Sequence, residues 1–352
     1  MAYTIEIFVL TSAAVFLSVV GSVLFVDVTG TLCTVVASAL FACALFLMSP
    51  VACFCAAVIS AAASSLITYS VCGNIINALA GLLYIAVGAF IYFGVKTKQP
   101  RTRITVGAAC FLAVFHALLV VLYFFMKTGT FSIAMVSSMV EAGLTEGAEL
   151  AAGQIPAFSA MPESDKAAYM LELVTNTKAL APALFVLYSA LVAYLSTSFF
   201  RPAYNIFIPM ANPGRKKIKN KYWRLNISLA SAATAVIAIF VSFFVPSQKY
   251  PLPSVILTNL IYIVAPGFCI VGIYFVHDKI FKEKTGIFSV VLAAGALIAA
   301  LVLPVSLIAL IFVLIFSGLY ATLIGDIKKL IEKAKKALLG DDDGDDDDDY
   351  ID

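Results

Sequence analysis

Long apolar stretches recur along the chain and are separated by short polar segments. A helix needs about 20 mostly apolar residues to cross a hydrocarbon core of about 30 Å, where its backbone must hydrogen-bond to itself. Pro50 and Pro304 each separate two adjoining stretches without a charged residue, so each marks either a tight turn or a kinked, re-entrant hairpin. The pattern predicts an all-α, polytopic transmembrane helix bundle of about eight to ten spans, at 5–26, 31–49, 51–70, 75–95, 104–126, 179–199, 226–245, 254–276, 286–302 and 305–324.

The overall composition agrees with lipid as the solvent. Of the 352 residues, 62% are hydrophobic and only 12% are charged. Soluble globular domains have about 25% charged residues. A soluble globular fold is therefore excluded, and the lipid bilayer is the first expected partner.

The basic residues predict the orientation, because Lys and Arg concentrate in loops that face the cytoplasm. Four clusters, near 96–103, 201–224, 279–284 and 328–336, contain all of them except Lys127, Lys166, Lys178 and Lys249. With ten spans, all four clusters fall on one side of the membrane. Both termini are therefore predicted to be cytoplasmic, and the localisation is predicted to be the inner membrane of a bacterial cell.

Polarity divides the chain into five parts. We expect N-terminal spans over 1–126, an acidic extracytoplasmic segment over 127–177, and C-terminal spans over 178–325. Within 127–177, the stretch that begins at Pro162 predicts either a short interfacial helix or a solvated connector. A basic amphipathic helix should follow over 326–340 and lie against anionic lipid, and nine acidic residues predict a disordered tail over 341–352.

Three polar residues within spans are candidates for ligand binding. His116 lies in the middle of a span, where an ionisable group points to function unless it only hydrogen-bonds a neighbouring helix. Asn77 and Asn259 place amides within spans, where they either orient a polar ligand or join helices. We predict that all three line an intramembrane cavity.

The sequence contains no catalytic or metal-binding motif. HExxH, P-loop and GxSxG motifs are absent, and so are paired acidic residues within a span. The seven cysteines lack the spacing of metal ligands. The basic segment 201–224 flanks a span, which favours lipid contact over nucleic acid. We therefore expect no enzyme activity, cofactor, metal or nucleic-acid partner.

Several segments resemble a known family. KYWRLNISLA, TNLIYIVAPGFCIVGIYF and FSGLYATLIGDIKKL resemble the YybS-like family of uncharacterised bacterial multi-pass membrane proteins. The resemblance covers about 200–352 well and the N-terminal half more loosely. That family is distantly similar to the substrate-binding subunits of energy-coupling-factor transporters, which have about six helices and an alanine pair where this chain has Ser18 and Ser22. It implies ATPase or coupling subunits as partners.

Two functions are compatible with these features. The first is to bind or transport a small molecule in an intramembrane cavity. The alternative is a membrane scaffold or regulator that recruits soluble partners through its basic loops and acidic tail. The sequence does not identify the ligand.

Overall fold

The computed structural model describes residues 2–24, 28–130, 132–152, 161–212, 214–219, 223–246, 250–276, 278 and 304–339. These residues form eleven α-helices and no β-strand, which confirms the all-α prediction. They divide into two compact units, Met1–Trp223 (unit 1) and Arg224–Asp347 (unit 2). The predicted span 286–302 and the acidic tail 341–352 lie outside the described residues.

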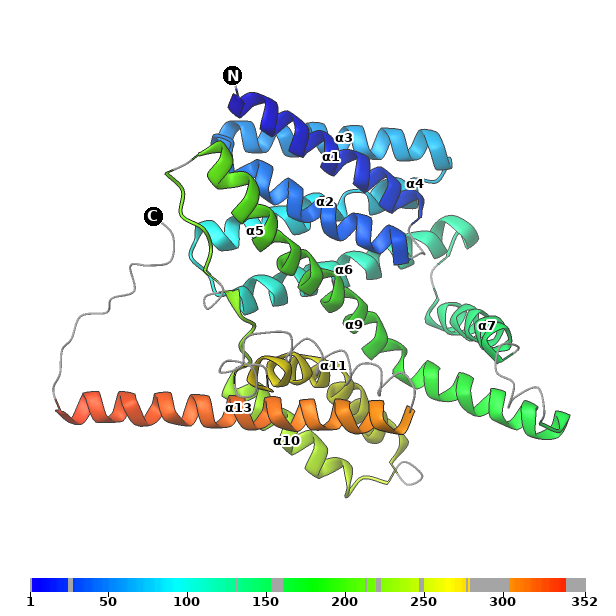
Figure 1. Cartoon of the computed structure of the whole chain (residues 1–352). Helices are drawn as coiled ribbons and strands as arrows, with labels where there is room; N and C mark the ends of the chain where they lie inside the picture. The colour runs from blue at the N-terminus through cyan, green and yellow to red at the C-terminus, as the bar shows by residue number, and fades with distance from the viewer. Residues whose placement is uncertain are drawn as a thin grey trace. The chain divides into compact units, whose positions relative to one another are not determined.

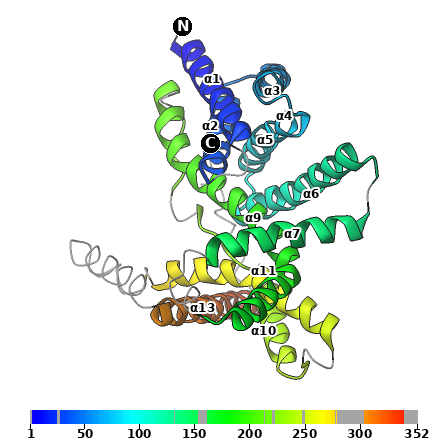
Figure 2. The same ribbon diagram turned by 90° about the vertical axis from the view of Figure 1, so that its right-hand side faces the viewer.

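Unit 1 contains eight of the helices. Central among them is α2, which packs against α1, α5 and α9 (Figures 1 and 2). The helices are α1 (Ala2–Val23), α2 (Val28–Phe46), α3 (Pro50–Cys72), α4 (Ile75–Ala80), α5 (Leu83–Lys96), α6 (Arg101–Thr128), α7 (Ile133–Ala152) and α9 (Glu163–Ala211).

Unit 2 contains α10 (Leu229–Ser242), α11 (Pro251–Val276) and α13 (Pro304–Leu339). Glycines let α11 and α13 cross at very short range. A Cβ placed on Gly272 would lie 1.9 Å from the Leu314 carbonyl oxygen, and one on Gly318 would lie 1.9 Å from the Phe268 carbonyl oxygen. Small residues at a crossing let two membrane helices bring their backbones together. The last span and the predicted amphipathic helix form one continuous helix, α13.

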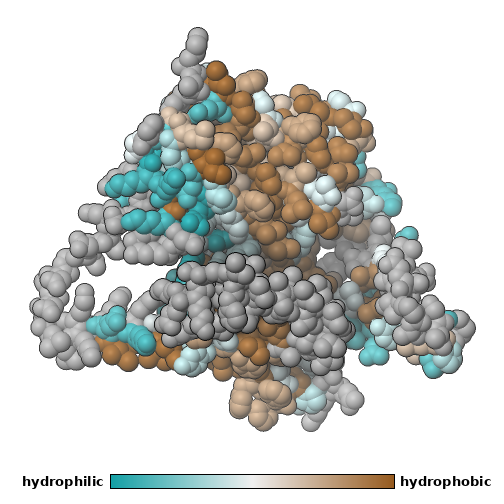
Figure 3. Space-filling view, in the orientation of Figure 1, coloured by the Kyte–Doolittle hydropathy of each residue, from teal (hydrophilic) through white to brown (hydrophobic). Residues whose placement is uncertain are grey.

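Eight helical segments among the described residues are long and apolar enough to cross a membrane. α3 shows most clearly that the surrounding medium is lipid. Its buried residues are Ser60, Ser64 and Thr68, whereas Phe54 and Ile59 are 73% and 67% exposed. Apolar residues cover the outer surface of α1 and α3 (Figure 3). The chain is therefore a multi-pass membrane protein.

α9 is much longer than a membrane span. Its 49 residues correspond to about 74 Å at 1.5 Å per residue, more than twice the hydrocarbon thickness. It includes the stretch from Pro162 that was predicted as an interfacial helix or connector, the predicted span 179–199, and part of the following basic segment. Near the start of α9, Lys178 pairs with Glu141 of α7 at 2.5 Å.

The helix ends predicted to face the cytoplasm gather at one end of unit 1. The start of α1 and the ends of α5 and α9 lie together there (Figure 1). The basic loops that follow α5 and α9 are also at this end, where hydrophilic residues dominate the surface (Figure 3).

Candidate functional site

The helical path is interrupted between α4 and α5, inside the segment predicted as one span at 75–95. α4 ends at Ala80 and α5 begins at Leu83, with a turn at Gly81 and Leu82. The Leu82 N–H donates to the Leu79 carbonyl at 3.0 Å, three residues back, which is tighter than an α-helix. Carbonyl groups released by such a break need other donors at membrane depth.

Serines of α1 and α3 supply these donors. Ser18 Oγ donates to the Gly81 carbonyl oxygen at 3.0 Å, and Ser65 Oγ donates to the Ala78 carbonyl oxygen at 3.2 Å. Ser18 Oγ also lies 2.8 Å from Ser64 Oγ, so hydroxyls of α1 and α3 meet at the break. The break is therefore held by side chains from two other helices.

Because Gly81 is a glycine and has no Cβ, these oxygens can approach one another. A Cβ placed on Gly81 would lie 2.7 Å from Ser64 Oγ, 3.0 Å from Ser22 Oγ and 3.3 Å from the Ala78 carbonyl oxygen. Three oxygen atoms therefore surround the open side of Gly81. We call Ser18, Ser22, Ser64 and Ser65 the hydroxyl cluster.

The buried polar face of α3 extends beyond this cluster. Ser60 and Thr68 lie one turn to either side of Ser64, and they are 1% and 0% exposed. Neither of their hydroxyl oxygens has a hydrogen-bond partner among the residues that the structure describes. A buried polar group without a partner is unfavourable by about 1–3 kcal/mol. A ligand that hydrogen-bonds these two hydroxyls would remove this cost.

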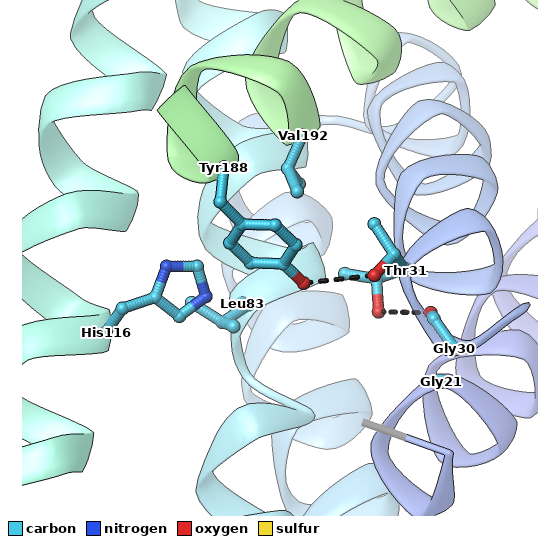
Figure 4. Close-up of a pocket in the computed structure, with 8 residues that line it drawn as sticks. Gly21, Gly30, Thr31, Leu83, His116, Tyr188 and Val192 are labelled. Atoms are coloured by element: carbon cyan, nitrogen blue, oxygen red, sulfur yellow. Dashed lines mark hydrogen bonds between the residues drawn. The ribbon is translucent and has the colours of Figure 1, made fainter. Parts of the chain in front are cut away.

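A small cavity adjoins the cluster. Its volume is about 10 Å³, which is room for about one water molecule. Thr31 Oγ1 on α2 lies 3.0 Å from the Tyr188 hydroxyl oxygen on α9, and together they form one wall (Figure 4). The lining residues are Gly21, Gly30, Thr31, Thr34, Leu83, His116, Tyr188 and Val192. Gly21 and Leu83 are the sequence neighbours of Ser22 and Leu82, but no residue of the cluster is among the described residues that line the cavity.

His116 lies on the opposite side of this cavity, facing Tyr188 (Figure 4). Its Nδ1 is 3.1 Å from Ser189 Oγ on α9, and its ring contacts those of Phe185 and Tyr188. The imidazole is 7% exposed. His116 therefore hydrogen-bonds the neighbouring helix α9 and also lines the cavity, and its role in ligand binding stays a prediction.

Comparisons with protein-family models, with curated proteins and with solved structures found no match to this chain. The resemblance to the YybS-like family therefore stays a prediction. What the site can do has to be argued from its own geometry.

The other two predicted site residues lie elsewhere. The side chain of Asn77 does not line the cavity, and its carbonyl accepts the Gly81 N–H at 3.2 Å. Asn259 belongs to unit 2, and its amide donates to the Val255 carbonyl of its own helix at 2.8 Å. Within unit 1, the structure does not bring the Asn77 side chain together with His116 at the cavity.

The serines of the cluster were not among the predicted site residues, although the sequence contains a signal for them. Ser60, Ser64 and Thr68 repeat every four residues in a mostly apolar span, which places three hydroxyls on one helix face. Asn74 has a simpler role, because its side chain caps α4 by accepting the Ile76 N–H at 2.9 Å.

A second feature is the basic loop after α9, which side chains hold in place. Asn205 bonds both the N–H and the carbonyl of Ile218, at 2.8 and 3.1 Å, and Ile218 is buried. Trp223 is buried as well, and its Nε1 donates to the Thr197 carbonyl at 2.8 Å. Lys216, Lys217 and Lys219 are exposed. The loop therefore presents positive charge in a defined position.

Arg101 fastens this loop to the start of α6. Its guanidinium donates to the Trp223 carbonyl at 3.0 Å, to the Tyr194 carbonyl at 3.4 Å, and to the hydroxyls of Thr197 and Ser198. It also stacks on the Tyr194 ring at 4.8 Å. Only 4% of Arg101 is exposed, so its guanidinium interacts with groups inside the protein.

Unit 2 has a larger pocket, of about 210 Å³, lined in part by Asn226 and Asp326. A bidentate pair between Arg224 and Asp278 also lines it. The hydrogen bond that Arg224 donates to Asp278 raises the pKa of Arg224, which keeps the guanidinium charged. These two charges neutralise each other, so the Asp326 carboxylate gives the described lining a net negative charge.

Proposed function

We propose that this protein binds a small polar solute within the membrane and carries it across. The carrying observation is the interruption between α4 and α5, where backbone carbonyls and the hydroxyl cluster meet in the same helix bundle as a small cavity. Broken membrane helices with exposed backbone groups form the binding sites of many transporters. In this proposal, the hydroxyl cluster and the cavity are two parts of one solute pathway.

The chemistry of these groups favours an uncharged or zwitterionic solute. Hydroxyls both donate and accept hydrogen bonds, and the carbonyls of Ala78 and Gly81 accept them. His116 adds a ring nitrogen on the far side of the cavity. No charged side chain is among the described residues that line it, so a strongly ionic solute would lack a counter-charge.

The small volume fits a closed conformation. A space of about 10 Å³ admits no sugar, amino acid or vitamin, so solute entry requires the helices around the break to separate. The turn at Gly81 and Leu82 is the natural place for such movement. There the α-helical hydrogen-bond pattern is interrupted, and serine side chains bond the carbonyls of Ala78 and Gly81. Alternation between closed and open forms is the basis of carrier function.

The remaining predictions form part of the same proposal. The protein would lie in the inner membrane of a bacterial cell with both termini in the cytoplasm. ATPase or coupling subunits would bind at the cytoplasmic end, where the basic loop is presented. No enzyme activity is proposed.

One observation favours the alternative of a scaffold or regulator. The exposed lysines of the loop after α9 are held in a defined place by Asn205, Arg101 and Trp223. A rigid basic surface suits an acidic soluble partner or anionic lipid. In this alternative, the loop is the functional element, and the cavity is a small packing defect without a function.

Thermal unfolding tests the solute proposal. The detergent-purified protein would be heated with sugars, amino acids, nucleobases, vitamins and lipid precursors. A ligand at 100 times its Kd adds about 2.7 kcal/mol of stability. Tyr188→Phe should weaken this effect because it removes the hydroxyl that faces Thr31, whereas the exposed Tyr69→Phe should not. Stabilisation by none of the compounds would favour the scaffold alternative.

A further inference from the structure

We propose that the hydroxyl cluster binds a monovalent alkali cation, Na⁺ or K⁺, at the break between α4 and α5. Purely neutral oxygens converge there from three helices. We expect the cation to drive the movement of the solute. This role of the cation rests on the proposed function. The cation site itself stands on separate observations and is tested without any solute.

The ligand atoms are hydroxyl and carbonyl oxygens that already lie within a few ångströms of one another. Ser18 Oγ is 2.8 Å from Ser64 Oγ and 3.0 Å from the Gly81 carbonyl oxygen. Ser64 Oγ, Ser22 Oγ and the Ala78 carbonyl oxygen surround the open side of Gly81 at 2.7, 3.0 and 3.3 Å from the position of a Cβ. Small rotations of the serine side chains would turn several of these oxygens toward a common centre.

The kind of oxygen selects the class of cation. Carbonyl oxygens replace the hydration shell of alkali cations in membrane proteins, and unwound helix backbone coordinates Na⁺ in transporters. Ca²⁺ and Mg²⁺ are held mainly through carboxylates. The hydrogen bonds of the cluster that the described residues make involve hydroxyls and carbonyls only, with no carboxylate. A monovalent cation therefore fits, and a divalent one does not.

The unsatisfied hydroxyls of α3 are a second, independent sign of a missing ligand. Ser60 and Thr68 flank Ser64 on the same buried face and are 1% and 0% exposed, and their hydroxyl oxygens have no hydrogen-bond partner in the described part of the chain. Packing alone does not explain them, because alanine would fill these positions without a buried polar atom. The two hydroxyls lie about 12 Å apart along α3 at 1.5 Å per residue, so a cation beside Ser64 would reach them only through its hydration water.

Binding would have a mechanical consequence. Ser18 belongs to α1, Ser64 to α3 and the carbonyls to the end of α4 and the turn after it, so one cation would tie three helices together at the hinge of the proposed carrier. We therefore expect the cation to stabilise the closed form and to resist separation of the helices around Gly81.

The first experiment compares cations on the intact chain. Purified protein in detergent is heated in choline chloride, with NaCl or KCl replacing choline at constant ionic strength. The proposal expects a saturable rise in the melting temperature with Na⁺ or K⁺ that choline does not produce. Identical melting temperatures in all three salts would overturn it.

Matched serine variants locate the effect. Ser18→Ala and Ser64→Ala each remove a ligand and should weaken the apparent cation affinity by about tenfold, since a bond to a charged group contributes about that much. Ser70→Ala is the control, because Ser70 lies on α3 but is exposed and bonds only its own helix. An unchanged cation response in both cluster variants would overturn the assignment to this site.

Direct binding covers the case in which the variants do not fold. Equilibrium binding of radioactive sodium or rubidium to the wild-type protein should saturate near one ion per chain. A wild-type chain that binds neither ion overturns the cation site and leaves the solute proposal to its own test. Cation binding without any stabilising solute would instead support the site and contradict the carrier function.

Discussion

Ser18 on α1 and Ser64 on α3 bring their hydroxyl oxygens to 2.8 Å although 46 positions separate them in the chain. Ser18 also donates to the carbonyl of Gly81, the residue at which the α4 to α5 path is interrupted. One hydroxyl thus connects a helix–helix contact to a backbone break. This relationship links the packing of unit 1 to its proposed site.

The Ser18–Ser64 contact should be measurable as a coupling energy. In a double-mutant cycle, Ser18→Ala and Ser64→Ala should couple by about 0.6 kcal/mol, the average for hydrogen bonds between membrane helices. Reversible unfolding in mixed micelles gives the four free energies. Ser18→Ala paired with Ser70→Ala should be additive, and additivity in the Ser18–Ser64 pair as well would contradict the contact.

The glycines between α11 and α13 predict the stability of unit 2. Gly318→Ala should destabilise the protein by about 2 kcal/mol, because the new methyl group would overlap the Phe268 carbonyl oxygen. Gly325→Ala on the same helix meets no atom within 4 Å and should be neutral. Thermal unfolding of the two variants compares them, and equal melting temperatures would show that the close crossing does not exist.

Arg101 should control access to the basic loop. Arg101→Lys keeps the charge but loses the planar fork that bonds the Trp223 carbonyl and the hydroxyls of α9. Limited trypsin digestion should then cut faster at Lys216, Lys217 and Lys219. Arg103→Lys serves as the control, because Arg103 is exposed and donates to Gln99, four residues before it in the chain. Unchanged cleavage in Arg101→Lys would mean that Asn205, Arg201 and Trp223 hold the loop without Arg101.

The orientation can be tested in cells. An epitope inserted after Met161 should be detected by antibody on intact cells whose outer barrier is opened, because the segment 127–177 is predicted to face outward. An epitope inserted after Gly214 should be detected only after the inner membrane is permeabilised. The reverse pattern would place the basic loops outside and would overturn the predicted topology.

Much of the fold could be predicted from hydropathy, because the length of an apolar helix is fixed by the membrane that it crosses. The spans of α1, α2, α3 and α6 agree with the predicted ranges to within a few residues. Length was harder to predict for α9, which continues through Pro182, Pro202 and Pro209. Neighbouring groups in a membrane bundle can satisfy the carbonyls that proline frees, so these prolines did not end the helix.

The site was less predictable, because it depends on tertiary contacts. The apolar residues around Gly81 and Leu82 continue the pattern of a span, so the break leaves no trace in hydropathy. His116 was recognisable as an ionisable group within a span, and it does line the cavity. Asn77 and Asn259 carry the same kind of signal, but their surroundings give them other roles. Only the packing of α1 against α3 shows which serines face the break.

The most direct test of the carrier proposal is uptake into vesicles. Proteoliposomes with the protein, and protein-free liposomes, would be incubated in a mixture of sugars, amino acids, nucleobases and vitamins, then washed, and their contents measured by mass spectrometry. The account predicts that at least one compound enters the protein-containing vesicles above the protein-free level, and that Tyr188→Phe slows its entry while Tyr69→Phe does not. Equal contents in both kinds of vesicle for every compound would contradict it.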